Sequence, residues 1–105
     1  MAGRVEGKIA LVTGGAMGLG KADCERLAAE GATVYVTDID LAGAEAVAKS
    51  IGGVAMQHDV RSPEQWQAVA DRIKADHGRL DILVNNAGNV IFETIEQCSL
   101  DNFKL

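Results

Sequence analysis

Glycines crowd the stretch from position 13 to position 20, which reads Thr-Gly-Gly-Ala-Met-Gly-Leu-Gly. Glycine has no Cβ, so its backbone can approach a ligand closely and adopt positive φ. The helical spacing that follows would aim unpaired N–H groups and the positive end of a helix dipole at the turn. We therefore interpret the stretch as a phosphate-binding turn. Taken alone, it also fits a tight strand-to-helix turn that binds nothing.

Further polar residues follow the other apolar runs of the chain. Asp38 ends a β-branched run 18 residues after Gly20, which is typical of an acid that binds the ribose hydroxyls of a dinucleotide. Asp59 follows a third run, and the segment 85–88, Asn-Asn-Ala-Gly, follows a fourth. That segment also fits an ordinary turn, because Asn and Gly tolerate left-handed backbone. Three suitable strand ends together favour a ligand site.

Apolar runs that alternate with segments of helical spacing must position these residues. We predict strands at 9–12, 33–37, 54–58 and 80–84. Helices should follow the glycine turn up to position 31, cover 44–51, and run from Pro63 to Gly78 behind a Ser62 cap. The first helix should bury Leu19, Ala22, Leu27 and Ala28, and the third should bury Trp66, Val69, Ala70 and Ile73. Residues 99–105 look like the start of a further helix.

This order predicts an α/β fold with a doubly wound, Rossmann-like parallel sheet of strand order 3-2-1-4. The first and fourth strands would then lie side by side, with the ligand crevice between their carboxyl ends. Val90 to Gln97 has no clear period, so the fourth strand should form an open edge. We therefore expect residues 1–105 to be the amino-terminal part of one incomplete domain.

Composition excludes several other classes of function. The net charge is −5 and Lys and Arg do not cluster, which argues against a nucleic-acid or membrane surface. The first apolar run breaks at Gly14, too early for a signal peptide or a membrane span, so we expect a cytoplasmic protein. Cys24 and Cys98 stand apart, outside any zinc or disulfide pattern, and are interpreted as small apolar residues. No metal site is predicted.

The chain resembles the classical short-chain dehydrogenase/reductases. Their T-G-x-x-x-G-x-G motif occurs at 13–20 and their N-N-A-G motif at 85–88, with Asp59-Val60 and the run 80–84 also matching. The resemblance covers essentially the whole chain. It implies a set of cofactor-binding residues, namely Gly14, Met17, Gly18, Leu19, Gly20, Asp38, Ile39, Asp59, Val60, Asn86, Ala87 and Gly88.

The resemblance also implies what each of these residues does. The glycine turn would hold the pyrophosphate and Asp38 the adenosine ribose, while Ile39 and Val60 would flank the adenine. Asp59 would accept from the adenine amino group, and residues 86–88 would line the ribose and nicotinamide side. Thr13 and Asn85 look structural.

The type of cofactor follows from the charge at position 38. A carboxylate there repels a ribose 2′-phosphate, and no Arg or Lys occupies positions 15–17 or 39–40 to compensate. NAD is therefore favoured over NADP.

The catalytic residues of that family have no match in this chain. The family uses a serine, a tyrosine and a lysine four residues after the tyrosine, whereas the sole tyrosine, Tyr35, precedes Ile39 by four and lies in a predicted strand. His58, His77 and Ser99 are interpreted as residues at the ends of strands or helices. We assign no catalytic residue and expect residues 1–105 alone to be inactive.

The resemblance implies an NAD-dependent oxidoreductase of small alcohols or ketones, homo-oligomeric when complete, to which this chain contributes the dinucleotide-binding half. Two alternatives remain open. The chain could form an NAD-binding module without catalysis. It could also belong to an S-adenosylmethionine-binding Rossmann protein, which would share the glycine turn and the acid but would not explain segment 85–88.

Overall fold

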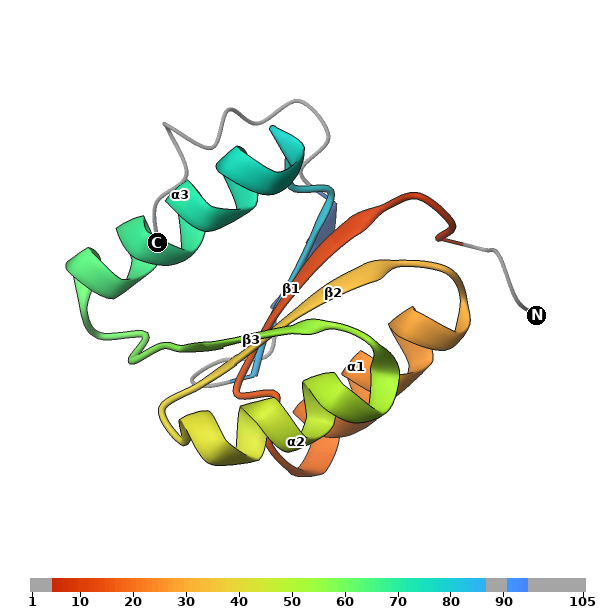
Figure 1. Cartoon of the computed structure of the whole chain (residues 1–105), viewed down its shortest axis with the longest axis horizontal. Coiled ribbons are helices and arrows are strands. Elements are labelled where there is room, and N and C mark those ends of the chain that lie inside the picture. The colour runs from red at the N-terminus through yellow and green to blue at the C-terminus, as the bar shows by residue number, and fades with distance from the viewer. Residues whose placement is uncertain (1–4, 87–90, 95–105) are drawn as a thin grey trace.

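The structure is a computed structural model that describes residues 5–86 and 91–94. Strands and helices alternate along the chain and then end in a strand pair (Figure 1). The elements are β1 (Ile9–Thr13), α1 (Gly18–Ala29), β2 (Thr33–Asp38), α2 (Leu41–Ile51), β3 (Val54–Gln57), α3 (Pro63–His77), β4 (Ile82–Asn85) and β5 (Ile91–Thr94). The predicted order of elements is confirmed as far as β4.

The strands form one sheet in the order β3-β2-β1-β4-β5. The first four are parallel, as predicted, with β1 pairing both β2 and β4. The prediction of an open edge at β4 was wrong, because β5 pairs antiparallel with β4, with Ile82 opposite Thr94. Four residues are too short to show a period of two, so only the β-branched and aromatic composition of 91–94 could have indicated this strand.

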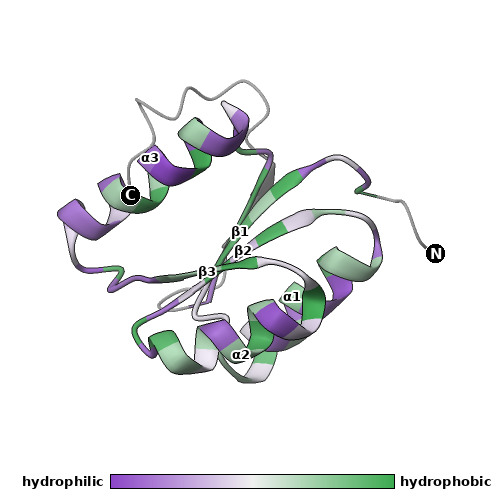
Figure 2. Cartoon of the chain, viewed as in Figure 1, coloured by the Kyte–Doolittle hydropathy of each residue, from purple (hydrophilic) through white to green (hydrophobic). Residues whose placement is uncertain are grey.

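Helices cover both faces of the sheet, with α1 and α2 on one face and α3 on the other (Figure 1). Alternate strand residues point to opposite faces, so two apolar cores form. Ala10, Val12, Val34 and Val36 pack with Cys24 and the apolar residues of α2, whereas Ile9, Leu11, Tyr35 and Leu83 pack with Trp66, Val69 and Ile73 of α3. Figure 2 shows that the strands carry mainly hydrophobic residues, whereas the helices carry both hydrophobic and hydrophilic ones, the latter most clearly on α3.

The third helix forms as predicted, and the first differs in which side it buries. Trp66, Val69, Ala70 and Ile73 are all buried on α3. On α1 the buried residues are Gly20, Cys24 and Leu27, while Leu19 and Ala22 are exposed. The prediction for α1 was wrong for Leu19 and Ala22 and is confirmed for Leu27. Gly20, which carries no side chain and so gives no apolar signal, is buried against the backbone of Gly14 instead.

At the amino ends of the strands, a buried carboxylate aligns β1 with β4. Asp81 Oδ2 accepts from the Ile9 N–H at 2.8 Å, and the Asp81 N–H donates to the Ile9 carbonyl at 2.9 Å. The guanidinium of Arg79 donates to the same carboxylate and to the Gly7 carbonyl. These bonds set the register in which the carboxyl ends of β1 and β4 meet. Within the described residues, no helix has the length and apolarity needed to cross a membrane.

Candidate dinucleotide-binding site

The carboxyl ends of four parallel strands meet at one edge of the sheet. The register places Thr13 of β1 opposite both Thr37 of β2 and Asn85 of β4, and Asp38 opposite Gln57 of β3. The residues that the sequence singled out at 13–20, 38–39, 59–60 and 85–86 therefore lie on neighbouring loops. Ala87 and Gly88 lie outside the described residues.

The glycine turn connects β1 to α1 at very close range. A Cβ on Gly20 would lie 2.0 Å from the carbonyl oxygen of Gly14, so only glycine lets the first turn of α1 pack on the loop. Gly14 and Gly18 have φ of 66° and 63°, in the left-handed region that favours glycine. No described atom lies within 4 Å of a Cβ built on Gly18. The turn thus presents bare backbone on its outer side.

Among the described residues, the first N–H groups of α1 have no side-chain partner. Met17 occupies the cap position, no described side chain accepts a hydrogen bond from the helix there, and no acidic residue lies in the first turn. Such a helix end carries unsatisfied donors and a positive dipole, which together favour an anion.

Exposed apolar side chains gather beside this helix end. The exposed large apolar residues of the described chain are Met17, Leu19, Ile39 and Leu41, with Met17 and Leu19 each 72% exposed. All four lie in the glycine turn, after β2, or at the start of α2. Exposed large apolar side chains in these segments are compatible with a partly apolar ligand.

The Asp38 carboxylate is fixed by two backbone bonds. Its Oδ2 accepts from the Ala16 N–H at 3.0 Å and its Oδ1 from the Asp40 N–H at 2.9 Å. A carboxylate can accept about four hydrogen bonds. Among the described residues, Asp38 therefore keeps one acceptor position on each oxygen, which matches a pair of neighbouring hydroxyls.

The loop after β3 is attached to β2 and to α3. The His58 N–H donates to the Asp38 carbonyl at 2.9 Å, and the buried His58 Nδ1 lies 3.1 Å from Thr37 Oγ1. The His58 ring packs edge-on against Trp66, with ring centroids 4.2 Å apart. Burial lowers the pKa of His58 to about 4, so its ring is neutral at pH 7.

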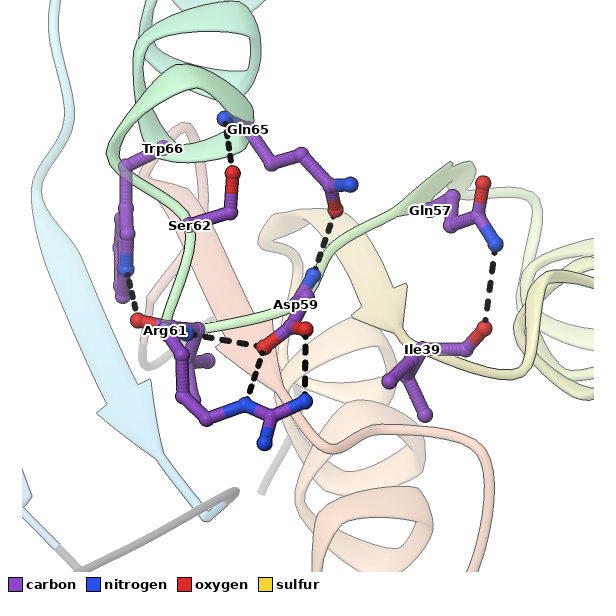
Figure 3. A network of polar contacts seen from close by, with 8 residues as sticks. Ile39, Gln57, Asp59, Arg61, Ser62, Gln65 and Trp66 are labelled. Carbon is purple, nitrogen blue, oxygen red and sulfur yellow. Dashed lines mark hydrogen bonds and ion pairs between the residues drawn. The ribbon is translucent and has the colours of Figure 1, made fainter.

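Figure 3 shows how α3 holds residues 59 and 60. The Gln65 side chain reaches past its own helix cap, and its Oε1 accepts from the Asp59 N–H at 2.6 Å. Trp66 Nε1 donates to the Val60 carbonyl at 2.8 Å. Gln57 Nε2 donates to the Ile39 carbonyl at 3.3 Å, which connects this loop to the one after β2. The two residues expected to flank an adenine therefore lie on connected loops.

The end of β4 is tied to β1 and to α1. Thr13 Oγ1 donates to Asn85 Oδ1 at 2.7 Å, and both residues are buried, in line with their expected structural role. The Asn86 N–H donates to the Thr13 carbonyl at 3.2 Å, and Asn86 Nδ2 donates to Asp23 Oδ2 of α1 at 3.0 Å. These bonds hold Asn86 beside the glycine turn.

This geometry fits a dinucleotide. Bare glycine backbone and an uncapped helix end suit a pyrophosphate, and a carboxylate with two acceptor positions suits a ribose diol. An apolar surface beside them suits a base. No described group of three or more His, Cys, Asp or Glu side chains could hold a metal ion. The fold is that of an α/β protein of the Rossmann type, and the carboxyl edge of its sheet is a candidate dinucleotide site.

Comparison with known proteins agrees with this class. The family model described as short chain dehydrogenase matches residues 8–104, and the chain belongs to that family. It is 45% identical over 102 residues to cyclopentanol dehydrogenase of Comamonas sp. (strain NCIMB 9872), covering 92% of this chain and 41% of that protein. The chain therefore spans less than half the length of this curated relative.

Two solved structures have similar folds. A hydroxysteroid dehydrogenase from Escherichia coli superimposes with a TM-score of 0.77 at 38% identity, covering 81% of this chain and 37% of that chain. A structure described as ribose-5-phosphate isomerase from Brucella melitensis 16M superimposes with a TM-score of 0.80 at 38% identity, covering 85% of this chain and 35% of that chain. Most of this chain therefore has a fold that is shared with parts of two longer proteins.

Tyr35 and Cys24 carry reactive groups, but both are buried in the apolar cores and lie away from this edge of the sheet. Tyr35 is buried and donates to Asp76 Oδ2 at 2.6 Å, and burial together with this bond raises its pKa. Burial also raises the pKa of the Cys24 thiol to about 12, so it stays protonated in the core at neutral pH. The interpretation of Tyr35 and Cys24 as core residues is confirmed, whereas Cys98 and Ser99 lie outside the described residues.

Sequence reasoning missed three residues that shape the site, namely Arg61, Gln65 and Trp66. It assigned Gln65 to the start of α3 and Trp66 to the buried face, but not to contacts with residues 59 and 60. The position of Arg61 two residues after Asp59 could have indicated their contact, since an aspartate commonly accepts from the backbone N–H two residues later. The Arg61 N–H does donate to Asp59 Oδ1, at 2.9 Å.

Proposed function

We propose that this chain forms the dinucleotide-binding half of an NAD-dependent oxidoreductase that acts on a small alcohol or ketone. The observation that carries the proposal is Asp38, whose carboxylate is held by the Ala16 and Asp40 N–H groups with one acceptor position left on each oxygen. A ribose with free 2′- and 3′-hydroxyls satisfies both positions. A 2′-phosphate would instead face the negative charge.

The assignment of the remaining residues supports the same cofactor. Gly14, Gly18, Gly20 and the first turn of α1, with Met17 and Leu19, would hold the pyrophosphate. Ile39 and Val60 would flank the adenine, Asp59 would accept from its amino group, and Asn86, Ala87 and Gly88 would line the nicotinamide side. The names of the related dehydrogenases favour a secondary alcohol or the corresponding ketone as substrate. When bound, NAD would supply the hydride acceptor.

The residues of this chain position the cofactor, and we propose that groups outside residues 1–105 transfer the proton. Tyr35 donates its hydroxyl to Asp76 on the α3 face of the sheet, away from the carboxyl ends of the strands. His58 is covered by Trp66. We further propose a cytoplasmic homo-oligomer that binds neither nucleic acid nor membrane.

Calorimetric titration of the intact protein with NAD and with NADP tests the proposal. Asp38→Ala should weaken NAD at least about tenfold, since two charge-assisted bonds are lost, and should leave NADP unchanged or tighter. Asp38→Asn has nearly the same shape as the wild type and keeps one acceptor oxygen. A loss of NAD affinity in this variant is therefore less open to an explanation by unfolding. Asp40→Asn is the matched control, because Asp40 caps α2 through the Gly43 N–H and its carboxamide would still do so.

Three results would contradict the proposal. Equal losses for NAD and NADP in Asp38→Ala would show that Asp38 does not select the cofactor. A wild-type preference for NADP would contradict the cofactor assignment. Competition in which S-adenosylmethionine displaces NAD at lower concentration than NADH does would favour the methyltransferase alternative instead.

A further inference from the structure

The Asp59 carboxylate is gripped by the residue two positions later. Its Oδ1 accepts from the Arg61 N–H at 2.9 Å and from Arg61 Nε at 3.0 Å, and its Oδ2 accepts from Arg61 Nη2 at 2.9 Å (Figure 3). Two parallel bonds from one planar guanidinium fix the plane of a carboxylate as well as its position. The backbone N–H of the same arginine makes the third of these bonds, so Arg61 contacts both oxygens of the carboxylate although its own side chain is 82% exposed.

The backbone that carries this carboxylate is fixed as well. The Asp59 N–H is taken by Gln65, and the Asp59 carbonyl accepts from the Ser62 N–H at 2.9 Å. Ser62 is in turn the cap of α3 and accepts from the Gln65 N–H at 3.2 Å. The orientation of Asp59 is therefore set by a rigid helix start and by Arg61 together.

The count of acceptor positions differs between the two carboxylates of the site. Of about four positions on Asp59, three are filled by Arg61, two on Oδ1 and one on Oδ2. Among the described residues one position is left, on Oδ2. Asp38 keeps two, one on each oxygen. Asp38 thus suits a diol, whereas Asp59 suits a single N–H donor held in one direction.

The group at the 6-position of a purine decides whether it can hydrogen-bond to the remaining acceptor position on Asp59 Oδ2. A 6-aminopurine presents an N–H donor at its 6-position, which a carboxylate accepts. A 6-oxopurine presents an acceptor oxygen there, which a carboxylate repels. A site built to accept from one N–H rejects an analogue that lacks it, because its own acceptor is then left unpaired.

We propose that Arg61 is the positioning residue that makes the base subsite selective for a 6-aminopurine dinucleotide over a 6-oxopurine dinucleotide, by holding Asp59 with one acceptor position available. This inference rests on the proposed dinucleotide function. The bonds from Arg61 also hold the pKa of Asp59 at about 2. An ordinary aspartate is ionised at neutral pH too, so the contribution of Arg61 there is orientation.

The test compares the affinity of the intact protein for NAD and for nicotinamide hypoxanthine dinucleotide, measured by calorimetric titration at pH 7. Arg61→Gln should lower the preference for NAD about tenfold, by weakening NAD and leaving the hypoxanthine dinucleotide unchanged. Arg61→Lys should retain part of the preference, since an ammonium makes one bond but not the fork. Arg26→Gln is the matched control, because it removes an equally charged, exposed arginine that pairs with Glu30 on α1.

Asp59→Asn provides a second route in case Arg61→Gln does not fold. Its amide nitrogen can donate to a purine oxygen, so the preference should shift towards the hypoxanthine dinucleotide by at least about tenfold. Circular dichroism and urea midpoints of each variant establish that the compared proteins are folded.

The outcomes separate the two proposals. A wild-type protein that binds neither dinucleotide overturns the proposed function and this inference with it. A wild-type protein that binds NAD overturns the inference alone if Arg61→Gln keeps the wild-type ratio, or if it weakens both dinucleotides equally as a purely structural arginine would. Asp59→Asn with an unchanged ratio also overturns it.

Discussion

The N-termini of α1 and α3 differ in how their first backbone N–H groups find hydrogen-bond acceptors. At α3, Ser62 Oγ accepts from the Gln65 N–H, Pro63 removes one donor, and Glu64 adds a negative charge to the first turn. At α1, Met17 offers no side-chain bond, no acid follows, and the backbone turns through Gly18 in the left-handed region. The first N–H groups of α3 are thus capped by residues of the helix itself, whereas those of α1 have no side-chain partner among the described residues.

This difference assigns the two helix ends to different roles, because a capped end stabilises the fold whereas an uncapped end can bind an anion. The cap of α3 stabilises the helix and also holds the loop at 59–60, so its polar groups are already paired within the chain. Asp40 does the same for α2, accepting from the Gly43 N–H at 3.1 Å. The donors at α1 cost stability unless an anion satisfies them. Three variants, Gly20→Ala, Leu19→Glu and Ser62→Ala, test whether the two kinds of helix end behave as differently as their geometry indicates, and a pH titration tests the loop beside α3.

The largest effect is expected from Gly20→Ala. A Cβ at 2.0 Å from the Gly14 carbonyl oxygen meets backbone that cannot move without displacing α1, so the free energy of unfolding should fall by about 3 kcal/mol or more. Urea unfolding measures this. Gly52→Ala is the contrasting variant, because Gly52 has φ of 72° but no described atom within 4 Å of its Cβ, so backbone strain alone should cost about 1 kcal/mol there. Equal losses would show that close packing at the glycine turn is not the cause.

Lowering the pH should reduce the free energy of unfolding through protonation of His58, which packs against Trp66 of α3. Its pKa is lowered from 6.5 to about 4 by burial, so the unfolded chain takes up a proton first. The contribution of the neutral ring is fully present above about pH 6.5 and is lost as the pH falls towards 4, by roughly 2–3 kcal/mol. Denaturation followed by the fluorescence of Trp66, the sole tryptophan, measures it.

The variant that tests the acid effect is His58→Gln. It should flatten the loss between pH 6.5 and 4, even if it lowers stability at neutral pH. A profile that His58→Gln leaves unchanged would assign the acid effect to other groups.

Leu19→Glu should change stability and binding in opposite directions. Leu19 lies exposed in the first turn of α1, where a negative charge stabilises a helix by about 0.5 kcal/mol. The same charge repels a pyrophosphate at that helix end, so NAD should bind about tenfold more weakly. Ala68→Glu adds the same charge on an exposed part of α3 and should alter NAD affinity little. Unchanged NAD affinity in Leu19→Glu would contradict the placement of the pyrophosphate.

The smallest effect is expected from Ser62→Ala. Loss of the bond to the Gln65 N–H should lower the free energy of unfolding by about 1 kcal/mol, the ordinary value for a helix cap. NAD affinity should change by less than about twofold, because the α1 end is untouched. Thermal unfolding and titration of the same sample measure both. A large loss of affinity would mean that the α3 cap acts on the site directly.

Most of the fold was predictable from local patterns. Ser62, Pro63 and Gly78 mark both ends of α3 because caps and positive φ are properties of single residues. The order 3-2-1-4 followed from the alternation of strands and helices. The buried side of α1 was not predictable in the same way. Leu19 is apolar but exposed, whereas Gly20 is buried against the backbone of Gly14.

The sequence by itself determined which residues stand at the strand ends, because a glycine turn, an acid and an amide pair each follow an apolar run. Only the tertiary structure decided how those residues are held. Arg61 around Asp59, Gln65 and Trp66 against the loop at 59–60, and β5 beside β4 depend on side-chain direction and on pairing across the fold. Such contacts leave no periodic signal in the chain, since they are set by packing between elements and not by spacing within one.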